Sequence, residues 1–205
     1  MATRGWPAAS IGVAGLVLSG GFATNGTAEP LPRGPLERNP PHVVGPPPAH
    51  TGGFGEPTCL ECHTGSDLNE PGSTLEVIGL GTMYVPGASV EITIRLRSFD
   101  MNAAGFQAAF RWADGPRAGQ TAGSLATTDD RVGLTDPSIT GVQYVQHTSS
   151  GVPADGEEAA WTFEWTAPAE RGTIALHVAA NSGNGDNSPL DDLVYTAEIR
   201  LESGG

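Results

Sequence analysis

The amino-acid sequence predicts an all-β protein: an antiparallel β-sandwich preceded by a proline-rich linker and a short cysteine-containing segment. Glycine (29 residues) and proline (17) make up more than a fifth of the 205 residues, which favours many turns between short strands. Seven or eight candidate strands follow one another at short spacing, and no stretch has the period of an amphipathic helix. The length suits one domain with extensions.

Two segments show the alternation of a half-buried strand most clearly. In residues 89–97 every second residue is apolar, and in residues 161–166 the aromatic residues occupy every second position. The side chains expected to face the core are Val90, Ile92, Ile94, Leu96, Trp161, Phe163 and Trp165. Further strands are expected within residues 74–80, 104–112, 143–147, 173–180 and 193–201. Turn-rich breaks such as ADGPRAG, PADGEE and NSGNGDNSP separate them. Together they predict a sandwich over residues 73–202.

The N-terminus, residues 1–28, has the pattern of a secretory signal peptide. Arg4 precedes an apolar stretch from Ala8 to Leu18, small residues follow, and no acidic residue occurs before Glu29. Cleavage is expected after Ala23 or Ala28; the alternative is an apolar tail that is not cleaved. The apolar run is too short and too rich in glycine for a good membrane span. We therefore expect an exported protein, periplasmic or extracellular, that does not span the membrane after cleavage.

Residues 29–57 contain nine prolines and no hydrophobic periodicity. Such a segment buries too little apolar surface to offset its ordering entropy, so the sequence predicts an extended linker. The whole chain is acidic, with a formal net charge of -13 and arginine as its basic residue type throughout. No basic stripe is available for a phosphate backbone, so a nucleic-acid partner is not expected.

The segment 58–72 holds the motif that points to a cofactor. Cys59 and Cys62 are the only cysteines of the chain, and His63 follows at once. The C-x-x-C-H spacing is typical of covalent c-type haem attachment, in which two thiols bind the haem and the imidazole binds its iron. A zinc site would need further ligands, and a thioredoxin-like dithiol normally belongs to a βαβ unit. A plain disulfide is the third alternative.

Several segments together resemble a known family. TGGFGEPTCLECHTG, YVPGASVEITIRL, GFQAAFRWADG, VQHTSSG, WTFEWTAPAERGTIALHVAANSGNGD and DDLVYTAEI are similar to bacterial proteins with a reeler-like domain of the choice-of-anchor V type. The resemblance covers residues 51–201. Many of those proteins carry one C-x-x-C-H ahead of the domain. The resemblance implies an immunoglobulin-like, reeler-type sandwich and says little about function.

If haem is bound, His63 is the proximal ligand and a sixth iron ligand has to be found. The candidates are His42, His50, Met83, Met101, His147 and His177. His42 and His50 lie in the predicted linker, His177 alternates with core residues of its strand, and the methionines suit the core. His147 ends a predicted strand, and a histidine also stands there in the resembling family, where a structural role competes. We expect His147 as the distal ligand, with Met101 next.

The sequence thus predicts an exported monohaem c-type cytochrome, with haem c held by Cys59, Cys62 and His63. It would carry single electrons to a redox partner protein rather than act as an enzyme. The alternative is a binding or adhesion module whose haem is structural or absent. A third hypothesis is a haem sensor or small oxidase with an open sixth position. Residues 181–192 also contain several Asn and Asp residues that invite a calcium hypothesis, although the spacing is not that of an EF-hand.

Overall fold

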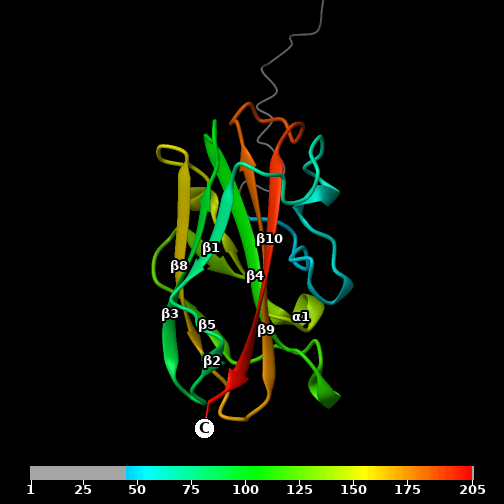
Figure 1. Cartoon of the computed structure of the whole chain (residues 1–205), viewed down its shortest axis with the longest axis vertical. Coiled ribbons are helices and arrows are strands. Elements are labelled where there is room, and N and C mark those ends of the chain that lie inside the picture. The colour runs from blue at the N-terminus through cyan, green and yellow to red at the C-terminus, as the bar shows by residue number, and fades with distance from the viewer. Residues whose placement is uncertain (1–44, 205) are drawn as a thin grey trace, which may run out of the picture. The chain divides into compact units, whose positions relative to one another are not determined.

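The computed structural model describes residues 45–204. The predicted signal peptide, the first part of the predicted linker and His42 lie outside the described residues. Figure 1 shows two β-sheets packed face to face, with β1, β3 and β8 on one side and β4, β9 and β10 on the other. The expected all-β sandwich is therefore confirmed.

The strands are β1 (Thr74–Ile78), β2 (Met83–Tyr84), β3 (Ser89–Arg97), β4 (Ala103–Trp112), β5 (Ser124–Thr127), β6 (Val132–Leu134), β7 (Val145–His147), β8 (Glu158–Thr166), β9 (Thr173–Gly183) and β10 (Leu193–Ser203). One short helix, α1 (Pro137–Thr140), and four 3-10 turns, η1 (Gly53–Gly55), η2 (Cys59–Glu61), η3 (Gly115–Arg117) and η4 (Ser149–Gly151), complete the elements in the described part of the chain.

The four-stranded sheet has the order β1-β3-β8-β5, and the six-stranded sheet has the order β2-β10-β9-β4-β7-β6. Within the described strands the pairs are antiparallel except for β2, which runs parallel to β10. The predicted alternation of β3 and β8 is confirmed, because their inward side chains are buried, Val90 at the start of β3 only partly. β2, β5 and β6 are too short to show a period, and the sequence pattern missed them.

Stacked aromatic rings join the two sheets. The ring centroids of Phe110 (β4) and Trp165 (β8) lie 4.3 Å apart with an interplanar angle of 9°, and those of Phe106 and Trp161 lie 4.7 Å apart. The two indole N–H groups donate to the main-chain oxygens of Ala122 and Gly151, so these large side chains are buried without an unsatisfied donor. This core fixes β4, whose other face forms one wall of the site described below.

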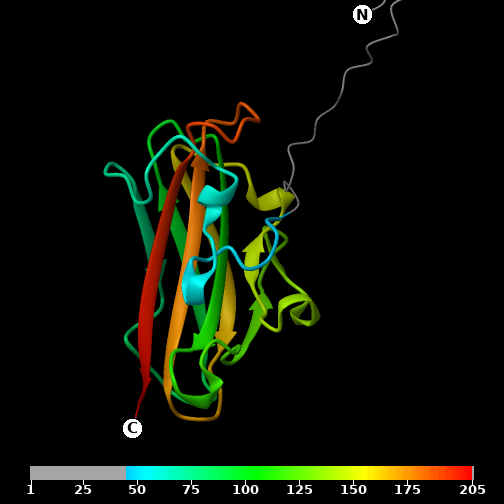
Figure 2. The same cartoon turned by 90° about the vertical axis from the view of Figure 1, so that its right-hand side faces the viewer.

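The outer face of the six-stranded sheet is covered by residues 45–57, which we call the strap. Figure 2 shows this segment in front of the sheet that contains β9. Its Thr51 is 1% exposed. The main-chain N–H of His50 donates to Gln107 Oε1 at 2.7 Å, and Gln107 Nε2 donates to the oxygen of Pro47 at 3.0 Å. The end of the predicted extended linker is thus fixed on the sandwich, because hydrogen bonds replace the apolar burial that its sequence lacks.

A buried ion pair attaches the C-terminal end of the strap to β4. Arg111 of β4 donates to Glu56 Oε1, and the hydroxyl of Tyr144 donates to the same oxygen at 2.5 Å. Thr51 Oγ1 donates to the other carboxylate oxygen at 2.6 Å. Burial alone raises the pKa of Glu56, but these hydrogen bonds outweigh it and the net pKa is lowered. The pKa of Tyr144 is raised, first by burial and then by its bond to the carboxylate.

Candidate functional site

The cysteine motif forms one helical turn at the end of the strap. Thr58 Oγ1 accepts a hydrogen bond from the N–H of Leu60 and caps the turn η2. The N–H groups of Cys62 and His63 both donate to the oxygen of Cys59, at 3.2 and 2.8 Å. Because residues four apart share one side of a turn, Cys59 and His63 lie on the same side.

The residues after His63 are fixed against the start of β10. The N–H of Thr64 donates to the oxygen of Pro189 at 2.9 Å, and the N–H of Asp191 donates to the oxygen of Thr64 at 2.8 Å. Further along, the N–H of Asn69 donates to the oxygen of Val194. The motif is therefore held against a segment that lies more than a hundred residues further along the chain.

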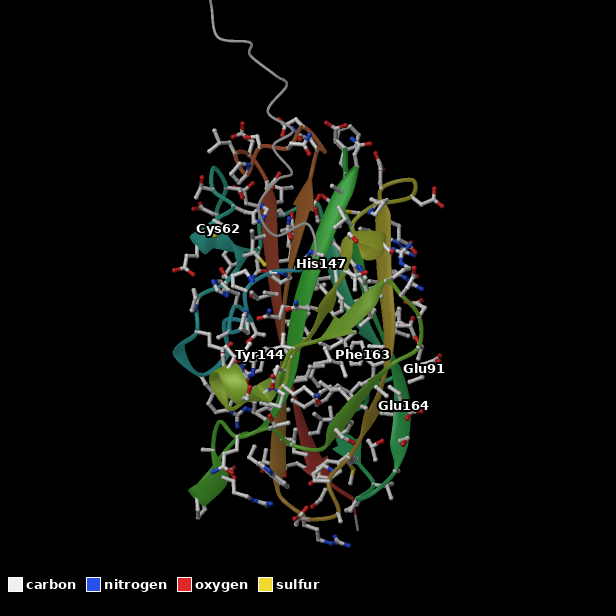
Figure 3. The ribbon with its side chains drawn as sticks, turned by 180° about the vertical axis from the view of Figure 1, so that it is seen from behind. Cys62, Glu91, Tyr144, His147, Phe163 and Glu164 are labelled. Carbon is white, nitrogen blue, oxygen red and sulfur yellow. The ribbon has the colours of Figure 1, made fainter. Side chains whose placement is uncertain are left out.

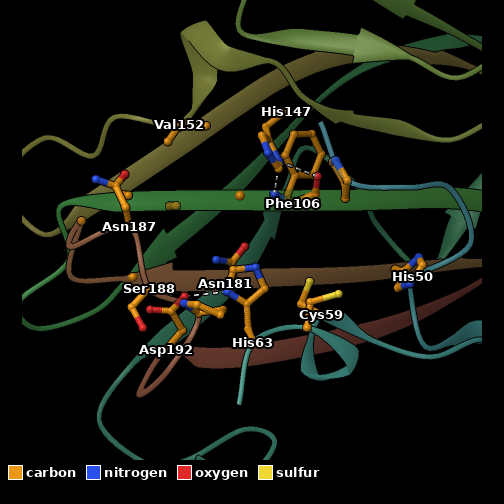
Figure 4. Close-up of a pocket in the computed structure, with 18 of the residues that line it drawn as sticks. His50, Cys59, His63, Phe106, His147, Val152, Asn181, Asn187, Ser188 and Asp192 are labelled. Atoms are coloured by element: carbon orange, nitrogen blue, oxygen red, sulfur yellow. Dashed lines mark hydrogen bonds and ion pairs between the residues drawn. The ribbon is translucent and has the colours of Figure 1, made fainter. Parts of the chain in front are cut away.

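A cavity of about 450 Å³ lies beside this turn. All four residues predicted for haem binding, Cys59, Cys62, His63 and His147, contribute to its lining. Figure 3 shows Cys62 and His147 in the same half of the sandwich, and Figure 4 shows the cavity with His63 on one wall and His147 on the opposite one. The other lining residues come from the strap, β4, the end of η4, and the end of β9 with the loop that follows: Pro46, Pro47, His50, Ala103, Ala104, Gly105, Phe106, Val152, Asn181, Gly183, Gly185, Asn187, Ser188, Pro189 and Asp192.

His63 is oriented by a buried carboxylate. Its Nδ1 lies 2.5 Å from Oδ2 of Asp192, whose side chain is 5% exposed. Figure 4 marks this contact on the wall opposite His147. An ionised carboxylate can only accept, so a neutral imidazole in this position carries its proton on Nδ1 and keeps the lone pair on Nε2. That is the tautomer in which a histidine binds a metal through Nε2.

His147 is buried, at 8% exposure, and its ring lies against the backbone of β4. The N–H of Phe106 donates to His147 Nδ1 at 3.0 Å, and the oxygen of Phe106 is 3.2 Å from the same nitrogen. The first contact needs Nδ1 as an acceptor, whereas the second needs it as a donor. Ligation of iron through Nε2 requires the second arrangement. His147 ends β7, as the sequence predicts, and its ring is buried against Phe106.

The other candidate ligands have surroundings that do not favour iron binding. His50 lines the cavity, but its Nε2 lies 2.6 Å from Glu61 and its Nδ1 lies 3.1 Å from two main-chain oxygens. Both nitrogens thus face oxygen acceptors, so binding iron through either one would break a contact that the ring already makes. Met101 is 3% exposed in the hydrophobic core, and Met83 is 63% exposed on β2. His177 lies beneath Phe54, where burial lowers its pKa. None of the last three lines the cavity.

The two cysteines differ in environment. Cys59 is the more covered thiol, and burial raises its pKa to about 12, with a smaller contribution from Cys62. Cys62 is exposed. A redox-active dithiol depends on a thiol whose pKa is lowered, and Cys59 has the opposite shift. Its environment does not favour the dithiol alternative.

The donor set fits a c-type haem. One turn supplies two thiols and an imidazole whose Nε2 keeps its lone pair, and a second imidazole lies on the opposite wall. The cavity volume lies within the usual range of small-molecule sites. No arginine or lysine lines this cavity in the part of the chain that the structure describes.

Within residues 45–204 no three His, Cys, Asp or Glu side chains form a metal cluster, so the calcium hypothesis gains no support.

Sequence reasoning missed three parts of this site. The sequence points to Asp192 only through the calcium hypothesis for residues 181–192, and no pattern marks Gly105 or, apart from His50, the strap. The signal for Asp192 was weak, because its partner His63 is 129 residues away in sequence. The signal for Gly105 was a glycine inside a strand, which often marks a close approach of another group.

In the described residues no helix is long and apolar enough to cross a membrane.

A scan against protein-family models found no match, and a search of curated proteins found none either. Among solved structures, the chain is similar to the human F-spondin reeler domain, with 19% identity and a TM-score of 0.43 over 67% of this chain and 95% of that one. It is similar to the Reelin-N domain of F-spondin, with 17% identity, a TM-score of 0.45, and coverage of 72% and 96%. A cohesin module from Clostridium perfringens has 13% identity, a TM-score of 0.41, and coverage of 65% and 97%.

Proposed function

We propose that the protein is an exported monohaem c-type cytochrome, periplasmic or extracellular, of the reeler-like choice-of-anchor V type. The observation that carries this proposal is the position of the C-x-x-C-H turn: it forms one wall of a cavity, and a second histidine stands on the opposite wall.

Each residue has a separate task under this proposal. Cys59 and Cys62 hold the haem covalently, and His63 presents Nε2 to the iron because Asp192 occupies Nδ1. Apolar residues of β4 and the strap limit the access of water. The haem, when bound, supplies one-electron redox chemistry, and the protein passes that electron to a partner protein. No catalytic group is assigned.

His147 is the proposed sixth ligand. Its Nε2 binds iron only if Nδ1–H donates to the oxygen of Phe106, so the N–H of Phe106 then loses its acceptor. An unsatisfied buried N–H costs about 1–3 kcal/mol. A metal–ligand bond can offset that cost. If it does not, the sixth position stays open, as in the sensor or oxidase hypothesis, and the Phe106 contact is the observation that favours this variant.

The experiment is expression of the full chain in a host that matures c-type cytochromes, followed by haem staining and intact mass. We expect one covalent haem per chain, and none in the Cys59→Ser/Cys62→Ser variant. A His177→Ala variant, altered outside the cavity, should keep its haem. Purified protein of wild-type sequence without covalent haem would overturn the proposal.

The second candidate function is a binding or adhesion module without haem. The lack of arginine and lysine in the described cavity lining favours it, because the two haem propionates would have no cationic partner there. In that case the exported protein would keep both thiols free or join them in a disulfide. The mass of the mature protein distinguishes the two functions directly.

A further inference from the structure

Two adjacent aspartates stand at the start of β10, and they have different surroundings. Asp191 is exposed, whereas Asp192 is 4% exposed and directs Oδ2 to within 2.5 Å of His63 Nδ1. A buried carboxylate is costly unless hydrogen bonds or an opposite charge compensate it. Among the described residues His63 is the side chain that the structure gives Asp192 for this purpose.

The backbone around Asp192 is fixed on both sides. The hydroxyl of Ser66 donates to the main-chain oxygen of Asp192 at 2.6 Å. A Cβ at Gly183 would come within 3.0 Å of Asp192 Oδ1, and a Cβ at Gly65 would come within 2.8 Å of the Asp191 nitrogen. Because both positions are glycines, β9 and the segment after His63 can pack closely against Asp191 and Asp192. The carboxylate is held in place before any ligand enters the cavity.

We propose that Asp192 is a positioning residue with two effects on His63. It fixes the tautomer and the direction of the ring, so that Nε2 faces the cavity. Its negative charge also makes the imidazole a stronger donor, which favours ferric iron and lowers the reduction potential. No arginine or lysine among the described lining residues opposes that charge. The second effect rests on the proposed function; the first does not.

The first effect is tested in the haem-free full-length chain. ¹⁵N NMR of the neutral His63 ring reports which nitrogen carries the proton. We expect the Nδ1–H form with Asp192 present, and a shift toward the Nε2–H form in Asp192→Leu. Asp191→Asn, one residue away, should leave the signal unchanged. A wild-type His63 with its proton on Nε2 would overturn the positioning role.

The second effect is tested in the haem-loaded protein. Asp192→Asn keeps the shape and a hydrogen-bond acceptor but removes the charge. We expect its ferric-to-ferrous equilibrium to shift at least tenfold toward ferrous iron, a rise of 59 mV for a one-electron couple. Asp192→Glu keeps the negative charge, so its reduction potential should lie closer to the wild-type value than that of Asp192→Asn. Asp191→Asn removes the same charge at an exposed position and should shift the potential much less.

The outcomes separate the two proposals. Equal shifts in Asp192→Asn and Asp191→Asn would show a general charge effect and overturn the electronic role of Asp192. An unchanged potential in Asp192→Asn would overturn it as well. If the wild-type protein carries no covalent haem, the cytochrome proposal fails, and the NMR experiment still decides whether Asp192 positions His63. Circular dichroism of each variant confirms that the sandwich is folded.

Discussion

The ring of His147 lies directly against the Cα of Gly105. A Cβ at position 105 would come within 2.6 Å of His147 Cε1 and within 2.8 Å of both His147 Nδ1 and Asn181 Oδ1. These contacts come from the neighbouring strands on both sides of β4, and the ring of His147 is buried, so it cannot move away without repacking. The missing side chain of Gly105 is what allows His147 to reach the cavity wall.

Gly105→Ala should therefore displace His147 from Phe106. In the haem-loaded protein we expect loss of a low-spin spectrum, or a mixture of spin states, measured by absorption spectroscopy. The thermal midpoint should fall as well, because the Cβ overpacks a buried site at a cost of about 1–3 kcal/mol. Gly133→Ala is the matched control: it also adds a Cβ within a strand of the same sheet, where the neighbour at 3.3 Å is a threonine methyl. An unchanged spectrum in Gly105→Ala would argue against His147 as a ligand.

His147 itself gives a more direct test of the sixth ligand. His147→Ala should turn a low-spin spectrum high-spin and let the reduced protein bind carbon monoxide. His147→Met should keep six ligands if the geometry allows, with a higher reduction potential than two imidazoles give.

His50→Ala is the informative comparison, because His50 lines the same cavity and both of its ring nitrogens face acceptors. We expect its spectrum to stay low-spin. A low-spin spectrum that persists in His147→Ala would assign His147 the role of holding the backbone of Phe106.

The strap should depend on the charge of Glu56. Glu56→Gln leaves Arg111, which is 4% exposed, without its anionic partner. Loss of one partner of a buried pair costs about 3–5 kcal/mol. At pH 7 we expect the free energy of unfolding to fall by an amount near the lower end of this range, because Tyr144 and Thr51 can still form hydrogen bonds with the amide. Urea unfolding measures it.

The pH dependence of this loss follows from the lowered pKa of Glu56. The stabilisation is fully present above the unfolded pKa of about 4.3, and it is lost as the pH falls through the lower folded pKa. The difference between wild type and Glu56→Gln should therefore shrink toward pH 2–3. A difference that stays constant over this range would mean that the carboxylate charge does not hold the strap.

The two thiols should react at different rates in the folded, haem-free protein. Burial raises the pKa of Cys59 to about 12, so it is almost wholly protonated at pH 8, whereas Cys62 is exposed. The thiolate is the nucleophile, so iodoacetamide should modify Cys62 first. Mass spectrometry of peptides gives the order. In urea the two rates should converge, and equal rates in the folded protein would contradict the described burial of Cys59.

The sequence predicted the long strands well, because period-two alternation depends on one buried face. β3 and β8 have that property, and their inward residues were identified from the pattern alone. β9 has buried residues on both faces because the strap covers the second one, so its alternation is weaker. The strap was missed because its anchors are hydrogen bonds to Gln107, Arg111 and Tyr144, which leave no periodicity in residues 45–57.

The candidate site was partly accessible from the sequence for a similar reason. Cys59, Cys62 and His63 form a local motif whose spacing has chemical meaning, and a single helical turn realises it. Their placement in one cavity with His147 depends on tertiary structure, and the expectation for His147 rested on its position at the end of a strand. Asp192 and Gly105 act through contacts with residues far away in the chain, for which the sequence has no linear pattern.

The distance along the chain between His63 and Asp192 also bears on the order of events during biogenesis. The cysteine turn is synthesised before every strand of the described residues, while the groups that enclose it belong to β4, β7 and the segment after β9. Contacts across 129 residues form late, because closing so long a loop is slow. Under the proposed function, an attachment enzyme would meet both thiols on a segment of the chain that has not yet folded. The sandwich would then close around residues that have already been modified, so that maturation precedes enclosure.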